Sequence, residues 1–291
     1  MILLGVVVEL NDYERVQLEQ IREWRSEEPS VVSKSIGAVM SPIAWLLGKV
    51  VPSSATRAAL DVSSRTAAWL TDTNDIVREA GVKALGDLKT HDLKKSDELA
   101  NSVHNWAIGL ASIEGGVTGA TGLVGLAVDI PAIVILALRT ASKIGACYGF
   151  EAQSRSDRDF LLGILSASSA NDMKEKLRAL VVLHSVEVML TKNTWESIAR
   201  TAVHQQMGHE AGIIAVKSLA RQLGINLTKR KALQAIPVVG AVVGASVNYC
   251  FINDVSWAAR RAFQERWLAA NGKLRAAAEL TRELREGELK V

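Results

Sequence analysis

The sequence predicts an all-α protein, a multi-helix bundle built around two apolar, glycine-rich helical elements. Apolar residues recur at intervals of three and four along the chain, and capping residues mark several helix starts. The chain contains no runs of alternating apolar and polar residues between turn dipeptides, the pattern expected of strands. Its 291 residues include only five prolines, which leaves long stretches free to form helix.

The first expected helix covers residues 13–25, where Val16, Leu18, Ile21 and Trp24 recur among Glu and Arg residues. This spacing gives an amphipathic helix.

Further helix boundaries follow from local capping signals. Asp172 precedes Glu175 by three residues, which is the spacing of a capping box, and Asn193 has the same relation to Glu196. Another start is expected at Ser53. Helix ends of the Schellman type, with glycine before an apolar residue, are expected at residues 149–150 and 224–225.

Two segments are unusually apolar. Residues 115–138 carry Asp129 as their only charge, and residues 232–253 carry none. Their length would allow a membrane span, which needs about 20 apolar residues. Five glycines, the central Asp129 and the following Pro131 argue against insertion of the first segment, since a central Asp costs about 2.5–3.5 kcal/mol. We expect buried core helices, with Asp129 capping a helix that begins near Ile130, and the alternative is an inserting hairpin.

The glycines of both segments are spaced for close helix packing. Gly116 to Gly125 recur at steps of three, and Gly240 and Gly244 form a small-xxx-small pair. The run lacks the Lys-Ser/Thr pair that ends a phosphate-binding P-loop. We therefore expect the two elements to pack together through these glycines.

Domain organisation is less sharply marked. Residues 71–102 are polar and mixed in charge, and they divide the chain into an N-terminal helical arm, 1–90, and a core, 91–291. One continuous domain over 1–291 is the alternative.

Composition restricts the class of protein. A net charge of +3 gives no support for nucleic-acid binding, and Cys147 and Cys250, both in apolar runs, suit buried thiols of a reducing compartment. The N-terminus lacks the basic region and cleavage site of a signal peptide. We expect a cytoplasmic protein.

Several motifs together resemble one bacterial family. The run 114–125 (EGGVTGATGLVG), followed by 129–131 (DIP) and 148–151 (YGFE), is similar to the central signature of the EcsC family. Flanking segments at 80–85 and 236–249 agree with it. The family is named after a protein encoded beside an ABC transporter and is largely uncharacterised. The resemblance therefore implies no catalytic residues.

Candidate chemistry centres on a few charged residues. Glu114, Asp129 and Arg139 lie in or beside the apolar centre, where a charge must be paired or capped. They are either structural or the catalytic residues of a carboxylate or metal site. His184 and Glu187 are one helical turn apart, and with His204 they are weak candidates for metal ligands. No cofactor is indicated.

A basic cluster supports a membrane contact. Lys229, Arg230 and Lys231 directly precede the second apolar segment, and no acidic residue occurs between positions 211 and 253. Such a cluster suits anionic lipid headgroups, although a solvated turn is also compatible with it.

These observations lead to two functional hypotheses. The first is a membrane-associated accessory protein that binds lipid or a protein partner, peripheral on the inner face of the cell membrane. The alternative is a metal-dependent or carboxylate-based hydrolase with a site around Glu114, Asp129 and a nearby histidine. Whether the protein is an enzyme is left open by the sequence.

Overall fold

The computed structural model describes residues 9–29, 72–119, 126–192, 218, 222–223, 225–226 and 240–274. Within these ranges every regular element is helical and no strand occurs, so the all-α prediction is confirmed. The helices are α1 (Asp12–Ser26), α5 (Asn74–Ala80), the 3₁₀ helix η1 (Leu85–Thr90), α6 (Leu93–Gly119), α7 (Leu126–Cys147), α8 (Arg155–Ser169), α9 (Met173–Lys192) and α11 (Gly240–Ala270).

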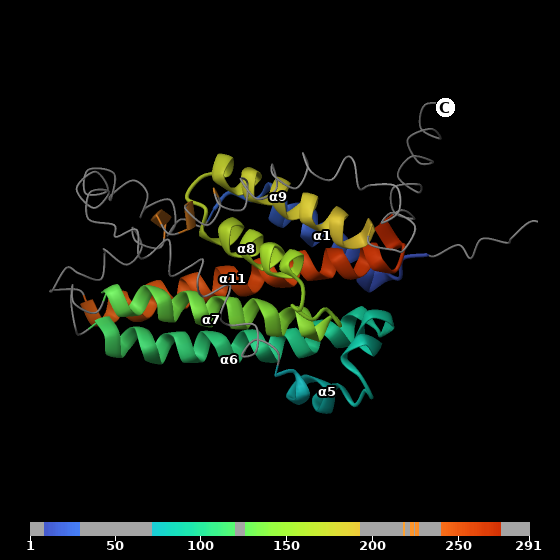
Figure 1. Cartoon of the computed structure of the whole chain (residues 1–291), viewed down its shortest axis with the longest axis horizontal. Coiled ribbons are helices and arrows are strands. Elements are labelled where there is room, and N and C mark those ends of the chain that lie inside the picture. Colours follow the sequence, from blue (N-terminus) through green and yellow to red (C-terminus); the bar gives the residue numbers. More distant parts are fainter. Residues whose placement is uncertain are drawn as a thin grey trace, which may run out of the picture.

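Helix α11 is the centre of the described structure. It packs against α6 and α7 on one side and against α8 and α1 on the other, as Figure 1 shows. Helices α8 and α9 pack closely against each other. The 31-residue α11 contains no proline, and its first charged residue is Asp254, which suits a helix surrounded by others.

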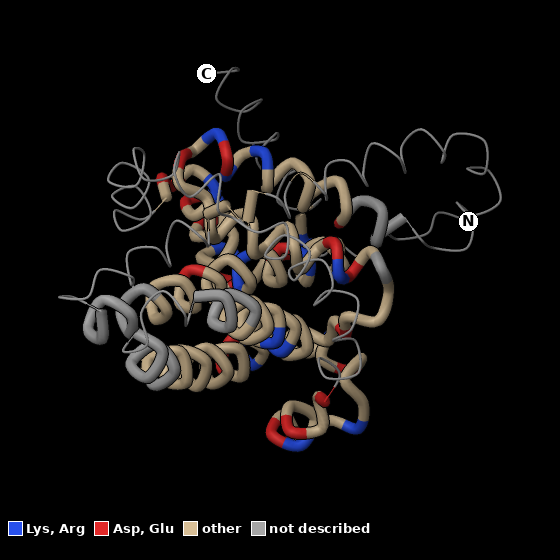
Figure 2. The backbone as a smooth tube through the Cα atoms, turned by 60° about the vertical axis from the view of Figure 1, so that its left-hand side comes forward, with Lys and Arg blue, Asp and Glu red and all other residues tan. Residues whose placement is uncertain are grey.

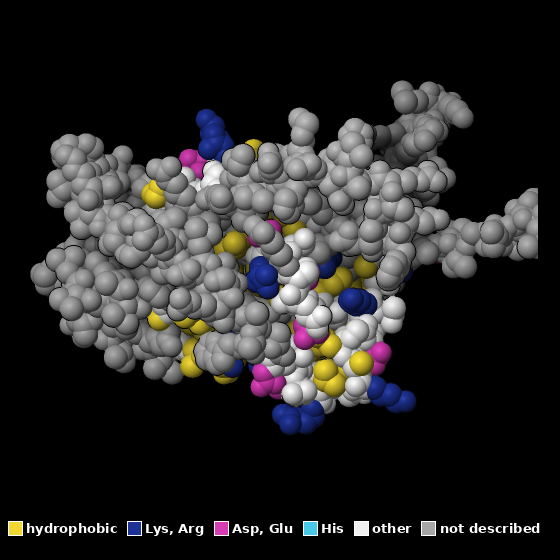
Figure 3. Space-filling view, viewed as in Figure 1, with side chains coloured by type: hydrophobic (Ala, Val, Ile, Leu, Met, Phe, Trp, Pro, Cys, Tyr) yellow, Lys and Arg dark blue, Asp and Glu magenta, His cyan; other side chains and the backbone are white. Residues whose placement is uncertain are grey.

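Charged residues are unevenly distributed over the helices. Figure 2 shows the tubes of α6 and α7 free of charged residues over most of their length. Figure 3 shows acidic and basic side chains mixed over the region of α5 and η1. No helix of the described residues is both long enough and apolar enough to span a membrane.

Helix α1 begins as a capping box, in which the Asn11 side chain accepts from the Glu14 amide and Glu14 bonds back to the Asn11 amide. Its buried residues are Glu14, Gln17 and Ile21. Val16, one of the apolar residues of this spacing, is 53% exposed. Polar residues replace it on the buried face because α1 packs on polar groups of α11 as well as on apolar ones.

Helix α7 ends in the predicted Schellman motif. The Phe150 amide donates to the Gly145 carbonyl and the Gly149 amide to that of Ala146, with Gly149 at φ +83°. The predicted Asp172 cap is also present, since its carboxylate accepts from the Glu175 amide at 2.8 Å. Gly224 of the second expected glycine end and the expected starts at Ser53 and Asn193 lie outside the described residues.

The glycine-rich segment 115–138 differs from the prediction at Asp129, where a helix was expected to begin. The first apolar element is the end of α6, and α7 is already helical at Leu126, so Asp129 lies inside the helix and does not cap it. Leu126, Ala127 and Val128 continue the helix upstream, which leaves Pro131 in its second turn. The C-terminal end of α6 and the N-terminal ends of α7 and α11 lie at the same end of the bundle (Figure 1). The contacts of the glycines themselves lie outside what the structure describes.

Parts of the expected N-terminal arm contribute to the main core. Ile21 of α1, Ile76 of α5 and Leu88 of η1 belong to the same apolar cluster as Ile144 of α7 and Phe263 of α11. The boundary at residue 90 stays a prediction.

Candidate functional site

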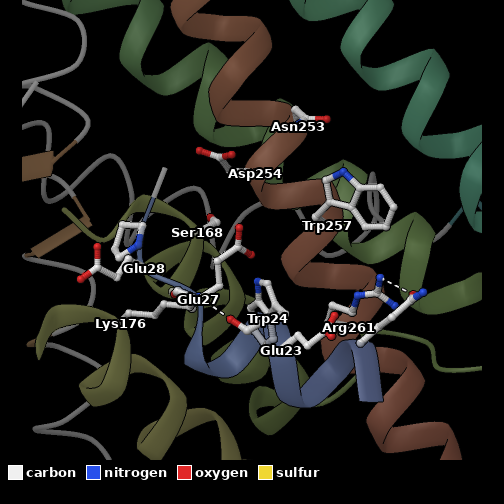
Figure 4. Close-up of a pocket in the computed structure, with 13 residues that line it drawn as sticks. Glu23, Trp24, Glu27, Glu28, Ser168, Lys176, Asn253, Asp254, Trp257 and Arg261 are labelled. Atoms are coloured by element: carbon white, nitrogen blue, oxygen red, sulfur yellow. Dashed lines mark hydrogen bonds between the residues drawn. The ribbon is translucent and has the colours of Figure 1, made fainter. Parts of the chain in front are cut away.

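A cleft of about 570 Å³ lies between the C-terminal end of α1, the facing ends of α8 and α9, and the middle of α11 (Figure 4). Trp24 and Trp257 contribute aromatic surface, and the charged residues of the described lining are four carboxylates and two cationic side chains. The lining residues are Gln20, Glu23, Trp24, Glu27, Glu28, Pro29, Ala167, Ser168, Lys176, Asn253, Asp254, Trp257 and Arg261.

Lys176 fixes the end of α1 against α9. Its ammonium group donates to the carbonyl of Trp24 and, at 2.6 Å, to that of Glu27, and it lies 5.2 Å from the centre of the Trp24 ring. These are orphan carbonyls of a helix terminus, where a cation is favourable. Burial lowers the pKa of Lys176, while the charges of Glu27 and Asp254 act in the opposite direction. The chain leaves α1 here, which places Glu27 at the cleft.

The α11 side of the cleft is a helical face formed by Asn253, Trp257 and Arg261, each one turn from the next. The Asn253 side-chain oxygen accepts from His104 Nε2 of α6 at 3.1 Å. The His104 ring also meets Trp257 edge to face, with 5.4 Å between the ring centres. Burial lowers the pKa of His104, which favours the neutral ring in this position. Trp257 is thus held by His104 of α6 on one side and by Arg260 and Arg261 of α11, whose guanidinium groups lie 4.6 and 5.3 Å from its ring centre.

Arg261 connects the cleft to a buried polar network. Its guanidinium donates to the side-chain oxygens of Gln17 at 3.0 Å, Gln20 at 2.8 Å and Gln264 at 2.9 Å. Gln264 in turn donates to the Asp97 carboxylate at 2.7 Å. Helices α1, α6 and α11 are therefore joined by one set of hydrogen bonds behind the cleft.

Asp97 is the acceptor at the centre of this network. Its carboxylate is 3% exposed and also accepts from the hydroxyls of Tyr13, at 2.7 Å, and Tyr148. Burial and the adjacent Asp97 charge raise the pKa of both phenols, so that both remain neutral donors. These groups have a structural role, because they satisfy one another inside the bundle.

The charges of the cleft are unbalanced in favour of acid. Among the lining residues that the structure describes, Glu23, Glu27, Glu28 and Asp254 outnumber Lys176 and Arg261 by two. Both cations are committed to hydrogen bonds with the protein, as described above. Figure 4 shows Glu27 of the α1 end and Asp254 of α11 pointing into the space between their helices. A cleft with aromatic surface and excess negative charge can hold an organic cation.

The cleft does not present an activated nucleophile among the residues described here. Ser168, the hydroxyl side chain in the lining, donates to the Leu165 carbonyl at 2.9 Å.

The residues predicted as catalytic lie elsewhere. Glu114 is near the end of α6 and Asp129 near the start of α7, at one end of the bundle, and their side chains are outside the described set. Arg139 lies in α7 with its guanidinium 5.6 Å from the centre of the Trp106 ring. A common site for the three stays a prediction.

The predicted metal ligands are only partly described. His184 Nδ1 and a Glu187 carboxylate oxygen are 3.9 Å apart, as their spacing predicts. Across the residues the structure describes, no three His, Cys, Asp or Glu side chains are grouped as a metal site would need. His204 lies outside this part of the chain, as do Lys229, Arg230 and Lys231.

Sequence reasoning missed the cleft because its parts are far apart in the chain. The spacing predicts Trp24 only as part of an amphipathic helix. Asp254 and Trp257 lie just after the apolar segment 232–253 and belong to no motif. The one local signal was the pair Glu27-Glu28 just after a helix, which by itself is typical of a solvated turn.

Comparison with known proteins agrees with the motifs. The sequence profile of the EcsC protein family matches residues 15–268. The chain is 25% identical over 195 residues to the "Uncharacterized protein YdbA" of Bacillus subtilis (strain 168), which covers 65% of this chain and 66% of that relative. No solved structure matches the chain. Because the match extends over most of its length, the chain belongs to the EcsC protein family.

Proposed function

We propose that this protein is a non-enzymatic binding module of the membrane surface, which takes up a cationic group of its ligand or partner in the Trp24–Trp257 cleft. The observation that carries the proposal is the cleft itself, where excess carboxylates line the same space as two tryptophans. An ammonium group with apolar substituents matches both features, because carboxylates neutralise its charge and aromatic faces attract cations within about 6 Å.

The C-terminal end of α1 adds to the negative charge that the carboxylates give the cleft. The carbonyls of a helix C-terminus carry partial negative charge, and here that terminus lies against the cleft. Lys176 compensates it locally, but its ammonium group is turned toward the Trp24 and Glu27 carbonyls. Glu23 and Glu27 therefore remain as acceptors for an added cation.

The membrane part of the proposal rests on the sequence. Lys229, Arg230 and Lys231 stand in a stretch without acidic residues and precede a segment without charge. Each such residue near an anionic surface contributes about 1 kcal/mol.

Thermal denaturation in the presence of organic cations tests the cleft. Choline, spermidine and Nα-acetyl-lysine amide should raise the melting temperature of the wild type in proportion to occupancy. The double variant Glu27→Gln/Asp254→Asn should lose this response. Glu98→Gln, which removes an exposed carboxylate on α6, is the matched control and should respond like the wild type. Equal responses from all three proteins would refute cation binding in the cleft.

Flotation with vesicles tests the membrane part. Binding to vesicles rich in phosphatidylglycerol should weaken with salt and in the triple variant Lys229→Ala/Arg230→Ala/Lys231→Ala. Replacement of Lys83 and Lys94, two exposed lysines near α5 and at the start of α6, provides a control for loss of charge alone. If the wild type and the triple variant float alike, the cluster makes no membrane contact.

A further inference from the structure

The outward face of α9 combines basic and apolar side chains in a way that the core does not require. Four exposed residues share this face at helical spacing. They are Lys174, Leu177, Arg178 and Val181. Leu177 is 51% exposed and Val181 66% exposed, one helical turn apart. A helix normally turns such residues inward, so this face is built to contact something else.

The acidic residues of α9 are turned away from this face or held by donors. One Glu175 carboxylate oxygen accepts from the Gln222 amide at 2.9 Å, and the other accepts from that of Asn226 at 3.0 Å. Glu187 is buried. Lys174 and Arg178 form no ion pair with any described residue. Among the described residues of α9, Lys174 and Arg178 thus outnumber the one carboxylate on this side, Glu175, whose oxygens accept from neutral amides.

A groove of about 640 Å³ runs along the same face. Leu177, Val181 and Val182 give it an apolar surface, and Ser218 and Gln222 form its other side. Its charged lining residues are Lys174, Arg178 and Glu175, whose carboxylate is held by the Gln222 and Asn226 amides. A ligand with a negatively charged group beside an apolar chain would be complementary to an apolar groove that has basic residues along it.

We infer that the outward face of α9 docks on anionic membrane lipid, with phosphate groups at Lys174 and Arg178 and acyl chain against Leu177 and Val181. The basic residues are complementary in charge to the phosphate, and the exposed apolar residues beside them suit an acyl chain, as in helices that lie in the membrane interface. The inference rests on the proposed membrane function and adds a second contact to the 229–231 cluster.

An environment-sensitive dye at position 181 tests the contact directly. The label is attached to Val181→Cys in a Cys250→Ser background. Cys147 can stay, because it is fully buried and burial raises the pKa of its thiol. Vesicles with phosphatidylglycerol should shift the dye emission to the blue, and vesicles of phosphatidylcholine alone should not. A label at Ser102→Cys, exposed on α6, should not respond.

Charge variants then separate this inference from the proposed function. Lys174→Ala/Arg178→Ala should bind anionic vesicles about 30-fold more weakly, since each basic residue at the surface contributes about fivefold. Lys83→Ala/Lys94→Ala should bind as the wild type does. If vesicles bind and only the 229–231 variant loses affinity, with no dye shift at position 181, the α9 contact is wrong and the proposed function stands. If the wild type binds no vesicles, both fail. A dye shift caused by an added acidic peptide but not by vesicles would replace lipid with a protein partner.

Discussion

At the residue scale, Gly145 of α7 packs closely against the ring of Phe263 of α11. A Cβ at position 145 would lie 2.5 Å from Phe263 Cζ. The Phe263 ring is 3% exposed and packs with Tyr148, Phe150 and Phe160, so it has little room to move. The sequence does not single out this glycine, because it is not part of a glycine repeat such as those at 115–125 and 240–244.

We predict that Gly145→Ala lowers the free energy of unfolding by about 1–3 kcal/mol, the usual cost of overpacking. Gly109→Ala is the matched control, because a Cβ there meets no atom within 4 Å. It should be neutral or stabilise the helix by about 0.5–1 kcal/mol. Urea denaturation of both variants measures the difference, and equal stabilities would contradict the packing argument.

Glu187 is a buried carboxylate whose protonation should affect stability. Burial, followed by the nearby charge of Glu265, raises its pKa from 4.5 to about 7, although Arg25 and Arg266 oppose the shift. The folded protein therefore holds this proton more tightly than the unfolded chain. The stabilisation is complete below pH 4.5 and is lost as pH rises through about 7.

Glu187→Gln should therefore stabilise the protein at pH 8, by an amount on the order of 2 kcal/mol, and have little effect near pH 4.5. Glu98→Gln, at an exposed position, should show no such pH dependence. Melting curves from pH 4.5 to 8 provide the test, and a variant that is less stable than the wild type at pH 8 would show that the charged carboxylate is favourable.

At the element scale, local signals in the sequence predicted helix ends better than helix contacts. The glycine at 149 and the cap at Asp172 were correct because the interactions that form them lie within five residues of chain. The start of α7 differs from the prediction, because Leu126, Ala127 and Val128 are already helical before the expected cap residue Asp129. Lys176 could not be assigned from sequence, since the carbonyls that it contacts lie about 150 residues earlier in the chain.

Lys176→Met should loosen the end of α1 while leaving α9 helical. The methionine keeps most of the apolar stem but removes two hydrogen bonds to main-chain carbonyls, at a cost of about 1–3 kcal/mol. Hydrogen exchange should accelerate at residues 22–27. Lys174→Met, an exposed neighbour on the same helix, should leave exchange in this segment unchanged. Protection of residues 22–27 that is equal in both variants would show that Lys176 does not fix α1.

At the scale of the whole molecule, the sequence predicted the class of fold but not how its segments are joined. Composition and periodicity were sufficient for an all-α bundle. The Asp97 network, in contrast, brings together Tyr13, Tyr148 and Gln264 from three other segments, and no local pattern identifies such partners. The same holds for the cleft, whose two tryptophans are more than 200 residues apart in the chain.

Asp97→Ala should therefore destabilise the N-terminal and C-terminal helices together. It leaves three donors without their acceptor, which at 1–3 kcal/mol each amounts to roughly 3 kcal/mol or more. Far-ultraviolet circular dichroism and tryptophan fluorescence should report one coincident, earlier transition in urea. Separate transitions for the two probes would instead support an independent arm over residues 1–90.

In the proposed function, the Trp24–Trp257 cleft recognises the positive charge of its ligand and not its shape alone. The most direct test is calorimetric titration with choline and with its neutral isostere 3,3-dimethylbutan-1-ol, which has the same shape without the charge. We predict that choline binds the wild type with one site per chain, that the neutral alcohol binds at least tenfold more weakly, and that Glu27→Gln/Asp254→Asn removes this preference. Equal affinity for the two compounds, or choline binding that is unchanged in the double variant, would contradict the proposed function.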